Sequence, residues 1–186
     1  MKKVNLFLVI LLTSTIFACN SAENKEAENE KAENVQSVGQ SGVQDDASQK
    51  NVVQVAVSSK DHTTLVTAIK AGELVDALSN AGPFTVFAPT NDAFNKLPAG
   101  TVEGLLKPES KETLIDILQY HVSLGVFKMD ALKDGQSIGQ VNGDNIKITK
   151  KAGVLYVNGT AKIVASIPAS NGIIHVIDGV LLPPKK

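Results

Sequence analysis

Few side chains in this chain of 186 residues could carry out chemistry. There are three histidines, His62, His121 and His175, and one cysteine, Cys19. No two of the histidines have the spacing of a metal-binding pair, and a lone cysteine offers neither a second thiolate ligand nor a partner for an internal disulfide. The residues therefore predict no metal site and no cofactor.

Two of the histidines belong to predicted secondary structure. His175 alternates with Ile173 and Ile177, so its side chain is expected on the same face of a strand. We interpret it as a buried neutral histidine that donates to a backbone carbonyl or a carboxylate; a ligand or proton-transfer role is the alternative. His121 is expected to end a helix, where an imidazolium would suit the negative end of the helix dipole.

The carboxylates show no catalytic arrangement either. A catalytic pair would require Asp92 and Asp178 to lie close together with separated pKa values. Asp92 is explained by the start of a helix, and Asp178, which precedes Gly179, by a turn or bulge. We predict no catalytic residue. A hydrolase assembled from scattered His, Ser and Asp side chains is the enzymatic alternative.

One stretch, residues 84–94, is predicted to form the central element around which the other helices and strands are arranged. Residues 84–88 alternate with the period-two pattern of a strand, and Pro89, which has no N–H to donate, ends it. Thr90 can then cap a helix, and Asp92 in its first turn suits the positive end of the dipole. Residues 84–94 therefore predict a strand that turns directly into a helix.

A second stretch, residues 171–183, lies near the other end of the chain. Asn171-Gly172 is a strong turn signal, and the apolar run after it predicts a strand covered on both faces. Between the two stretches, residues 110–120 have apolar side chains at helical spacing, which predicts a helix that ends at Tyr120 and His121.

The order of patterns indicates an α+β fold. Apart from residues 52–57, an apolar run that we interpret as a strand or a strap on the core, helical spacing dominates the first half of residues 51–186 and strand patterns the second. Strands are expected near residues 136–140, 146–149, 154–157, 162–165 and 173–182.

The two stretches and the Tyr-His pair between them resemble the fasciclin (FAS1) domain, over about residues 50–184. The resemblance implies a wedge-shaped β-sandwich of about seven strands with several helices packed on one side. It also implies a non-enzymatic extracellular module for adhesion or protein contact. The residues that carry the resemblance are Thr85, Phe87, Ala88, Pro89, Thr90, Asn91, Asp92, Phe94, Tyr120, His121, Asn171, Gly172, His175 and Asp178.

Two details of the resemblance concern binding. In the family the Tyr-His pair is chiefly structural, although it is also connected with cell binding in adhesive members. Integrin-binding relatives carry an Asp-Ile pair just before the second stretch, where this chain has Ser166-Ile167. Integrin-type recognition is therefore not expected here.

The first residues predict export. Lys2 and Lys3 precede an apolar run at residues 6–12 that is too short to span a bilayer, which is typical of a secretory signal. Residues 16–19, Ile-Phe-Ala-Cys, resemble the lipobox of bacterial lipoproteins and imply a signal peptide of residues 1–18 with lipid attached to Cys19. Ordinary signal cleavage beside a spare cysteine is the alternative.

Residues 19–50 are predicted to be a disordered acidic tether. They contain seven acids and three lysines and few apolar side chains, and Ala-Glu-Asn recurs three times with a period of five. We interpret the segment as a spacer between the membrane and one domain at residues 51–186; a solvated leader without a role is the alternative.

The amino-acid composition narrows the classes of partner that the domain is expected to bind. The chain has no Arg and no Trp, and residues 51–186 are nearly balanced, with 13 lysines and 12 acids. Scarce guanidinium groups and aromatic rings argue against nucleic-acid binding. The resemblances to the fasciclin domain and to the lipobox imply a lipid-anchored domain of the cell envelope, at the outer membrane or cell surface, that adheres to a protein or polysaccharide. A carrier of an apolar pigment or lipid is the runner-up.

Overall fold

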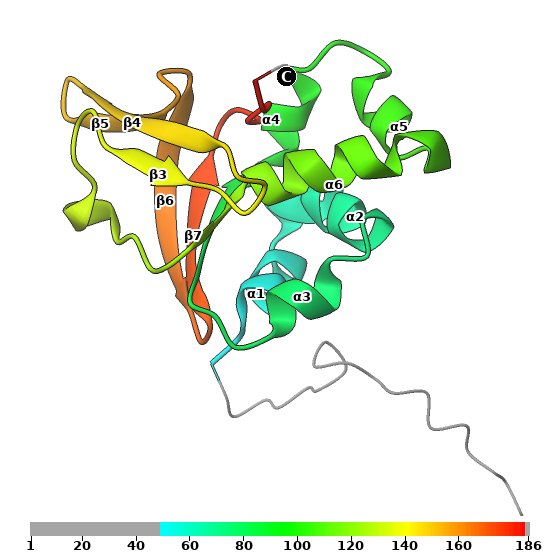
Figure 1. The fold of residues 1–186 in the computed structure, drawn as a ribbon, viewed down its shortest axis with the longest axis horizontal. Helices are drawn as coiled ribbons and strands as arrows, with labels where there is room; N and C mark the ends of the chain where they lie inside the picture. Colours follow the sequence, from blue (N-terminus) through cyan, green and yellow to red (C-terminus); the bar gives the residue numbers. More distant parts are fainter. Residues whose placement is uncertain (1–48, 185–186) are drawn as a thin grey trace, which may run out of the picture. The chain divides into compact units, whose positions relative to one another are not determined.

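Strand β1 (Phe84–Pro89) lies at the centre of the fold in a computed structural model that describes residues 49–184. It pairs in parallel with β7 (Gly172–Ile177) along its whole length, from Phe84 opposite Gly172 to Pro89 opposite Ile177. Both strands are buried beyond their first residue, as expected for strands covered on both faces. The two stretches marked in the sequence are therefore neighbouring strands (Figure 1).

The described strands form one mixed sheet in the order β2-β1-β7-β6-β5-β4-β3. Its two end strands approach each other, since the N–H of Val141 donates to the carbonyl of Val122 at 2.8 Å and Ser123 bonds Gln140. The sheet thus folds over and nearly closes. The remaining strands are β2 (Val122–Leu124), β3 (Ser137–Gly139), β4 (Asn145–Lys151), β5 (Val154–Val157) and β6 (Ala161–Ala169).

The described helices precede most of the strands and cover one side of the sheet (Figure 1). They are α1 (Val52–Ser58), α2 (Thr63–Ala71), α3 (Val75–Ser79), α4 (Asn91–Asn95), α5 (Thr101–Leu105) and α6 (Lys111–Tyr120). Short 3₁₀ turns are η2 (Lys60–His62), η3 (Pro108–Ser110) and η4 (Met129–Ala131). The expected α+β fold of seven strands with helices on one side is confirmed.

Two apolar cores meet at β1. Phe87 points into the folded sheet and packs in one cluster with Ile146, Ile148, Val157 and Ile177. Val86 and Ala88 point to the other face and join the helices in a second cluster that includes Leu65, Ile69, Leu114 and Leu118. The alternation of β1 therefore divides its side chains between the two cores.

Three predictions for individual elements differ from the structure. The strand expected at residues 173–182 is shorter, because β7 ends at Ile177 and Asp178 begins a bend. Residues 52–57 are neither a strand nor a strap, because they form α1, whose start is fixed by reciprocal hydrogen bonds between Asn51 and Gln54. β6 extends to Ala169, beyond the expected end at residue 165. Past residue 162 it pairs only with β7, so Pro168 removes no hydrogen bond that a second neighbouring strand would need.

The predicted signal peptide, Cys19 and nearly all of the predicted tether lie outside the described residues. Among residues 49–184, no helix has the length and apolar character needed to cross a membrane.

Candidate functional site

Thr90 and Asp92 start α4 as the sequence predicts. The N–H of Ala93 donates to Oγ1 of Thr90 at 3.3 Å, so Thr90 is the cap, and Asp92 lies in the first turn. Its exposed carboxylate is well placed for the positive end of the helix dipole. This pair explains the local turn from strand to helix without any catalytic role.

Asn91 acts on a different helix, which local sequence did not indicate. Its Oδ1 accepts from the N–H of Thr64 at 3.0 Å and from Oγ1 of Thr63 at 3.2 Å, while Nδ2 donates to the carbonyl of Lys60 at 3.0 Å. The residue at the N-cap of α2, His62, makes no side-chain capping bond of its own. Asn91 therefore caps α2 from a segment 27 residues away.

Asn171 joins three segments at the tip of the β6–β7 hairpin. Its Oδ1 accepts from the N–H of Val52 at 2.9 Å, in the first turn of α1. Its Nδ2 donates to the carbonyls of Leu78 and Asn80, both at 2.8 Å, at the end of α3. The amide thus uses donor and acceptor atoms to satisfy backbone groups at two helix ends.

The next residue, Gly172, is a glycine because no side chain fits at this position beside β1. A Cβ atom at this position would lie 2.1 Å from the carbonyl oxygen of Phe84. Gly82 is restricted in the same region, since its Cβ would lie 2.0 Å from the carbonyl oxygen of Asn171. The Asn-Gly turn of the second stretch is therefore a point of close backbone contact.

His175 is buried and bound to backbone, as predicted. Its Nε2 donates to the carbonyl of Phe127 at 2.7 Å, and its ring lies 5.5 Å from that of Phe87. Desolvation by burial lowers its pKa, although the bond to Phe127 opposes this shift. Thr85, also fully buried, accepts from the N–H of Phe127 at 3.0 Å and donates to the carbonyl of Gly125 at 2.7 Å.

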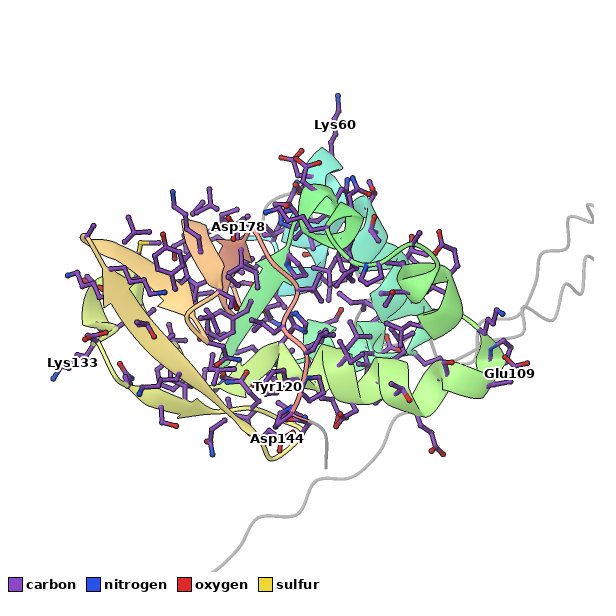
Figure 2. All side chains as sticks on the ribbon, turned by 90° about the horizontal axis from the view of Figure 1, so that it is seen from above. Lys60, Glu109, Tyr120, Lys133, Asp144 and Asp178 are labelled. Atoms are coloured by element: carbon purple, nitrogen blue, oxygen red, sulfur yellow. The ribbon has the colours of Figure 1, made fainter. Side chains whose placement is uncertain are left out.

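Tyr120 and His121 tie the end of α6 to distant segments. Tyr120 donates its hydroxyl to the carbonyl of Asn145 at 3.2 Å and accepts from Nδ2 of Asn158 at 3.0 Å. Nδ1 of His121 bonds the carbonyl of Ile117 at 2.8 Å, and its Nε2 accepts from the N–H of Leu181 at 3.0 Å. Figure 2 shows the C-terminal segment running from Asp178 toward Tyr120.

His121 ends α6 as predicted, but its ring is not the imidazolium that would suit the helix dipole. Burial lowers its pKa from 6.5 to about 4, and the bond to Ile117 offsets only part of this shift. Because Nε2 accepts a hydrogen bond, the proton must sit on Nδ1 and the ring is neutral at pH 7. The loss of solvation on burial therefore outweighs the attraction of the helix dipole for a charged ring at this position.

Asp178 has a structural role at the end of β7. Its Oδ1 accepts from the N–H of Lys162 at 2.8 Å, and its backbone carbonyl accepts from Nζ of Lys96 at 2.7 Å. The carboxylates of Asp92 and Asp178 share no hydrogen bond among the described residues. The sequence predicts a turn or bulge at Asp178; the chain bends at Asp178 and Gly179, next to a register shift between Ile163 and Ala165 of β6.

Two serine arrangements were missed by the sequence interpretation. Residues 135–139 match Gly-x-Ser-x-Gly, but Ser137 lies in β3 opposite Lys147 rather than at a strand-to-helix turn. Ser59 lies 2.8 Å from Nδ1 of His62, within a local turn in which Ser59 also caps η2. His62 is buried, and desolvation lowers its pKa.

The apolar cavity beside the C-terminal segment is small. It measures about 30 Å³ and lies between the helices and the C-terminal segment, bordered by Leu65, Phe94, Leu114 and Val180. Sites for drug-sized ligands measure roughly 300–1,000 Å³. Within the part of the chain that the structure describes, no three His, Cys, Asp or Glu residues gather where they could hold a metal ion.

Together, the fold and these contacts define an α+β domain in which the marked polar residues join backbone segments. A fasciclin domain model matches residues 60–183. The chain belongs to the fasciclin domain family, as the resemblance of its two stretches predicted. This family is known in adhesion proteins.

Two relatives show the range of the match. Protein sll1483 of Synechocystis sp. is 50% identical over 137 residues, which cover 74% of this chain and 76% of that protein. Transforming growth factor-beta-induced protein ig-h3 of Sus scrofa is 35% identical, and the match spans 72% of this chain but 19% of that longer protein.

A solved structure supports the fold alone. The FAS1 domain pair of the insect cell adhesion molecule fasciclin I matches with a TM-score of 0.57 at 20% sequence identity. The match covers 72% of this chain and 51% of the domain pair, about half of that structure.

Proposed function

We propose that this protein is an envelope-anchored adhesion module that binds a surface protein or polysaccharide and catalyses no reaction. The observation that carries the proposal is that the polar side chains of the family resemblance form hydrogen bonds within the domain itself. Asn91, Asn171, His121 and Tyr120 each spend both donor and acceptor atoms on other parts of the domain. A catalytic base or ligand-binding amide would need such atoms for a reacting molecule.

Adhesion is favoured because relatives of this fold include the cell adhesion molecule fasciclin I. A domain held together by internal polar contacts offers its outer surface to a partner. The apolar cavity of about 30 Å³ between the helices and the C-terminal segment is far smaller than sites for drug-sized ligands, which argues against a pigment or lipid carrier at this place.

The anchor in this proposal is lipid on Cys19, with residues 19–50 as the spacer. Lipid chains contribute about 0.8 kcal/mol for each buried CH₂ group, so more than one chain holds a protein stably at a membrane. Cys19→Ala should move the protein from the membrane to the soluble fraction. Membrane attachment that survives this substitution would refute the lipid anchor.

Attachment of cells tests the function. Producing cells that lack residues 51–186 should attach to a surface less well than cells with the full chain. A Ser48→Ala strain, altered outside the domain, serves as the matched control. Equal attachment by the deletion strain would contradict the adhesion proposal.

A further inference from the structure

The outer face of β4, β5 and β6 carries lysines without carboxylate partners. Ile146, Ile148, Leu155 and Val157 point into the sheet, so Lys147 and Lys151 lie on the opposite face of β4. Lys162 joins them from β6, opposite Tyr156 of β5. We call Lys147, Lys151 and Lys162 the lysine face.

None of these three lysines forms an ion pair with a described residue. The ion pairs among the described residues join Lys96 with Asp178 and Lys111 with Glu73. Lys151 donates to the neutral carbonyl of Gly159 at 2.9 Å and lies 5.3 Å from the centre of the Tyr156 ring. Each lysine is exposed, so the ammonium groups are available to an anion in solution.

The same face is hollowed. A groove of about 460 Å³ is lined by Lys147, Thr149, Asn158 and Asp134, together with Gly135 and Gly159. Its volume lies in the range of pockets that hold small ligands, roughly 300–1,000 Å³. Lys147 therefore borders a concave polar surface as well as belonging to the lysine face.

Asp134 makes the groove selective. Its Oδ1 accepts from the N–H of Lys150 at 2.7 Å, and this is the one hydrogen bond of the carboxylate among the described residues. A second carboxylate beside it would be repelled, whereas a hydroxyl group can donate to it. The groove thus favours a hydroxyl donor at Asp134 and an anion at Lys147.

We propose that the lysine face and its groove bind an acidic polysaccharide, a polymer that carries both carboxylates and hydroxyl groups. Lys147 and Lys151 are four residues apart on one strand, so their Cα atoms are separated by roughly 13 Å, and a repeating polyanion can reach both. Thr149 supplies a hydroxyl group between them, whereas the Asn158 amide holds the wall of the groove through Lys147 N–H and the Tyr120 hydroxyl. This inference rests on the proposed adhesion function and names the chemistry of its partner.

Binding of polygalacturonate to the purified full chain tests the inference. The triple variant K147Q/K151Q/K162Q should lose about tenfold or more in affinity, and binding to the parent should weaken as salt rises. K60Q/K70Q/K107Q removes three exposed lysines from the helical side and should bind like the parent. Equal losses in both variants, or no binding by the parent, would overturn the proposal.

Binding of other polymers distinguishes an acidic polysaccharide from other possible ligands of the lysine face. Neutral dextran should not bind, and polyglutamate and single-stranded DNA should bind at least about tenfold more weakly than polygalacturonate. Polyglutamate or DNA that binds as tightly would show a general polyanion surface and overturn the polysaccharide assignment. Both triple variants should keep the melting temperature of the parent, because all six lysines are exposed.

Cell attachment distinguishes this inference from the function on which it rests. Loss of attachment in cells without residues 51–186, together with normal attachment by K147Q/K151Q/K162Q, would refute the lysine face and leave the adhesion proposal standing. Normal attachment by the deletion strain would refute the adhesion proposal itself.

Discussion

The N–H of Leu181 donates to Nε2 of His121 at 3.0 Å, across 60 residues of sequence. The other ring nitrogen bonds the carbonyl of Ile117, so the neutral imidazole links the end of α6 to the segment that follows β7. Protonation of Nε2 would replace this accepted hydrogen bond with two facing N–H donors. The relationship makes stability depend on pH.

Acid should destabilise the domain through His121. The pKa of His121 is about 4 in the folded state, whereas an ordinary histidine, as in the unfolded chain, has a pKa of 6.5. Between pH 4 and pH 6.5 the unfolded chain therefore binds more protons than the folded one. The free energy of unfolding should therefore be highest above pH 6.5 and fall as the pH drops toward 4. The loss from this residue approaches about 3 kcal/mol, measurable by urea unfolding across this range.

His121→Gln supplies the control for this pH dependence. The variant should be less stable at neutral pH but should lose less stability on acidification. His62 and His175, whose pKa values burial also lowers, contribute in the same direction and remain in the variant. An unchanged slope of unfolding free energy against pH would show that His121 does not carry the effect.

Asn171→Ala should cost about 2–4 kcal/mol, because three backbone groups at the ends of α1 and α3 lose their partner. Thermal or urea unfolding measures the loss. Asn95→Ala, at an exposed position at the end of α4, should change stability by less than about 0.5 kcal/mol. Similar stability of both variants would contradict the role assigned to Asn171.

Gly172→Ala should prevent stable folding or cost more than about 3 kcal/mol, because its Cβ would displace β1 from β7. Gly104→Ala provides the opposite case. A Cβ there meets nothing within 4 Å, and alanine favours the helix α5 by about 0.5–1 kcal/mol. Circular dichroism during heating compares the two, and a tolerant Gly172 would contradict the strand contact.

Asn91→Ala should destabilise the domain by about 1–2 kcal/mol through the uncapped start of α2. Asp92→Ala, which removes a favourable charge from the first turn of α4, should cost less than about 1 kcal/mol. Hydrogen exchange of the Thr64 amide locates the effect. Faster exchange in Asp92→Ala than in Asn91→Ala would reverse the two roles.

The sequence predicted elements whose causes are local. Alternation identified β1, Thr90 and Asp92 marked the start of α4, and Asn-Gly marked the turn before β7. The failure at α1 had a local cause as well. β-branched residues obscured the helix, although Asn51 and Gln54 form the spaced pair of a capping box that could have identified it.

Long-range contacts were beyond local patterns. Nothing near Asn91 or Asn171 indicates that each satisfies helix ends elsewhere in the chain. The neutral state of His121 follows from its burial and from Leu181, both of which depend on the completed fold. The lysine face likewise forms only when β4, β5 and β6 become neighbours.

Protease treatment of intact cells is the most direct test that this domain acts at the cell surface. An antibody to residues 51–186 provides the readout, and a cytoplasmic protein checks that the cells stay intact. The proposal predicts loss of the domain signal while the cytoplasmic protein survives. A signal that persists until the envelope is broken would place the domain inside and contradict adhesion to an external partner.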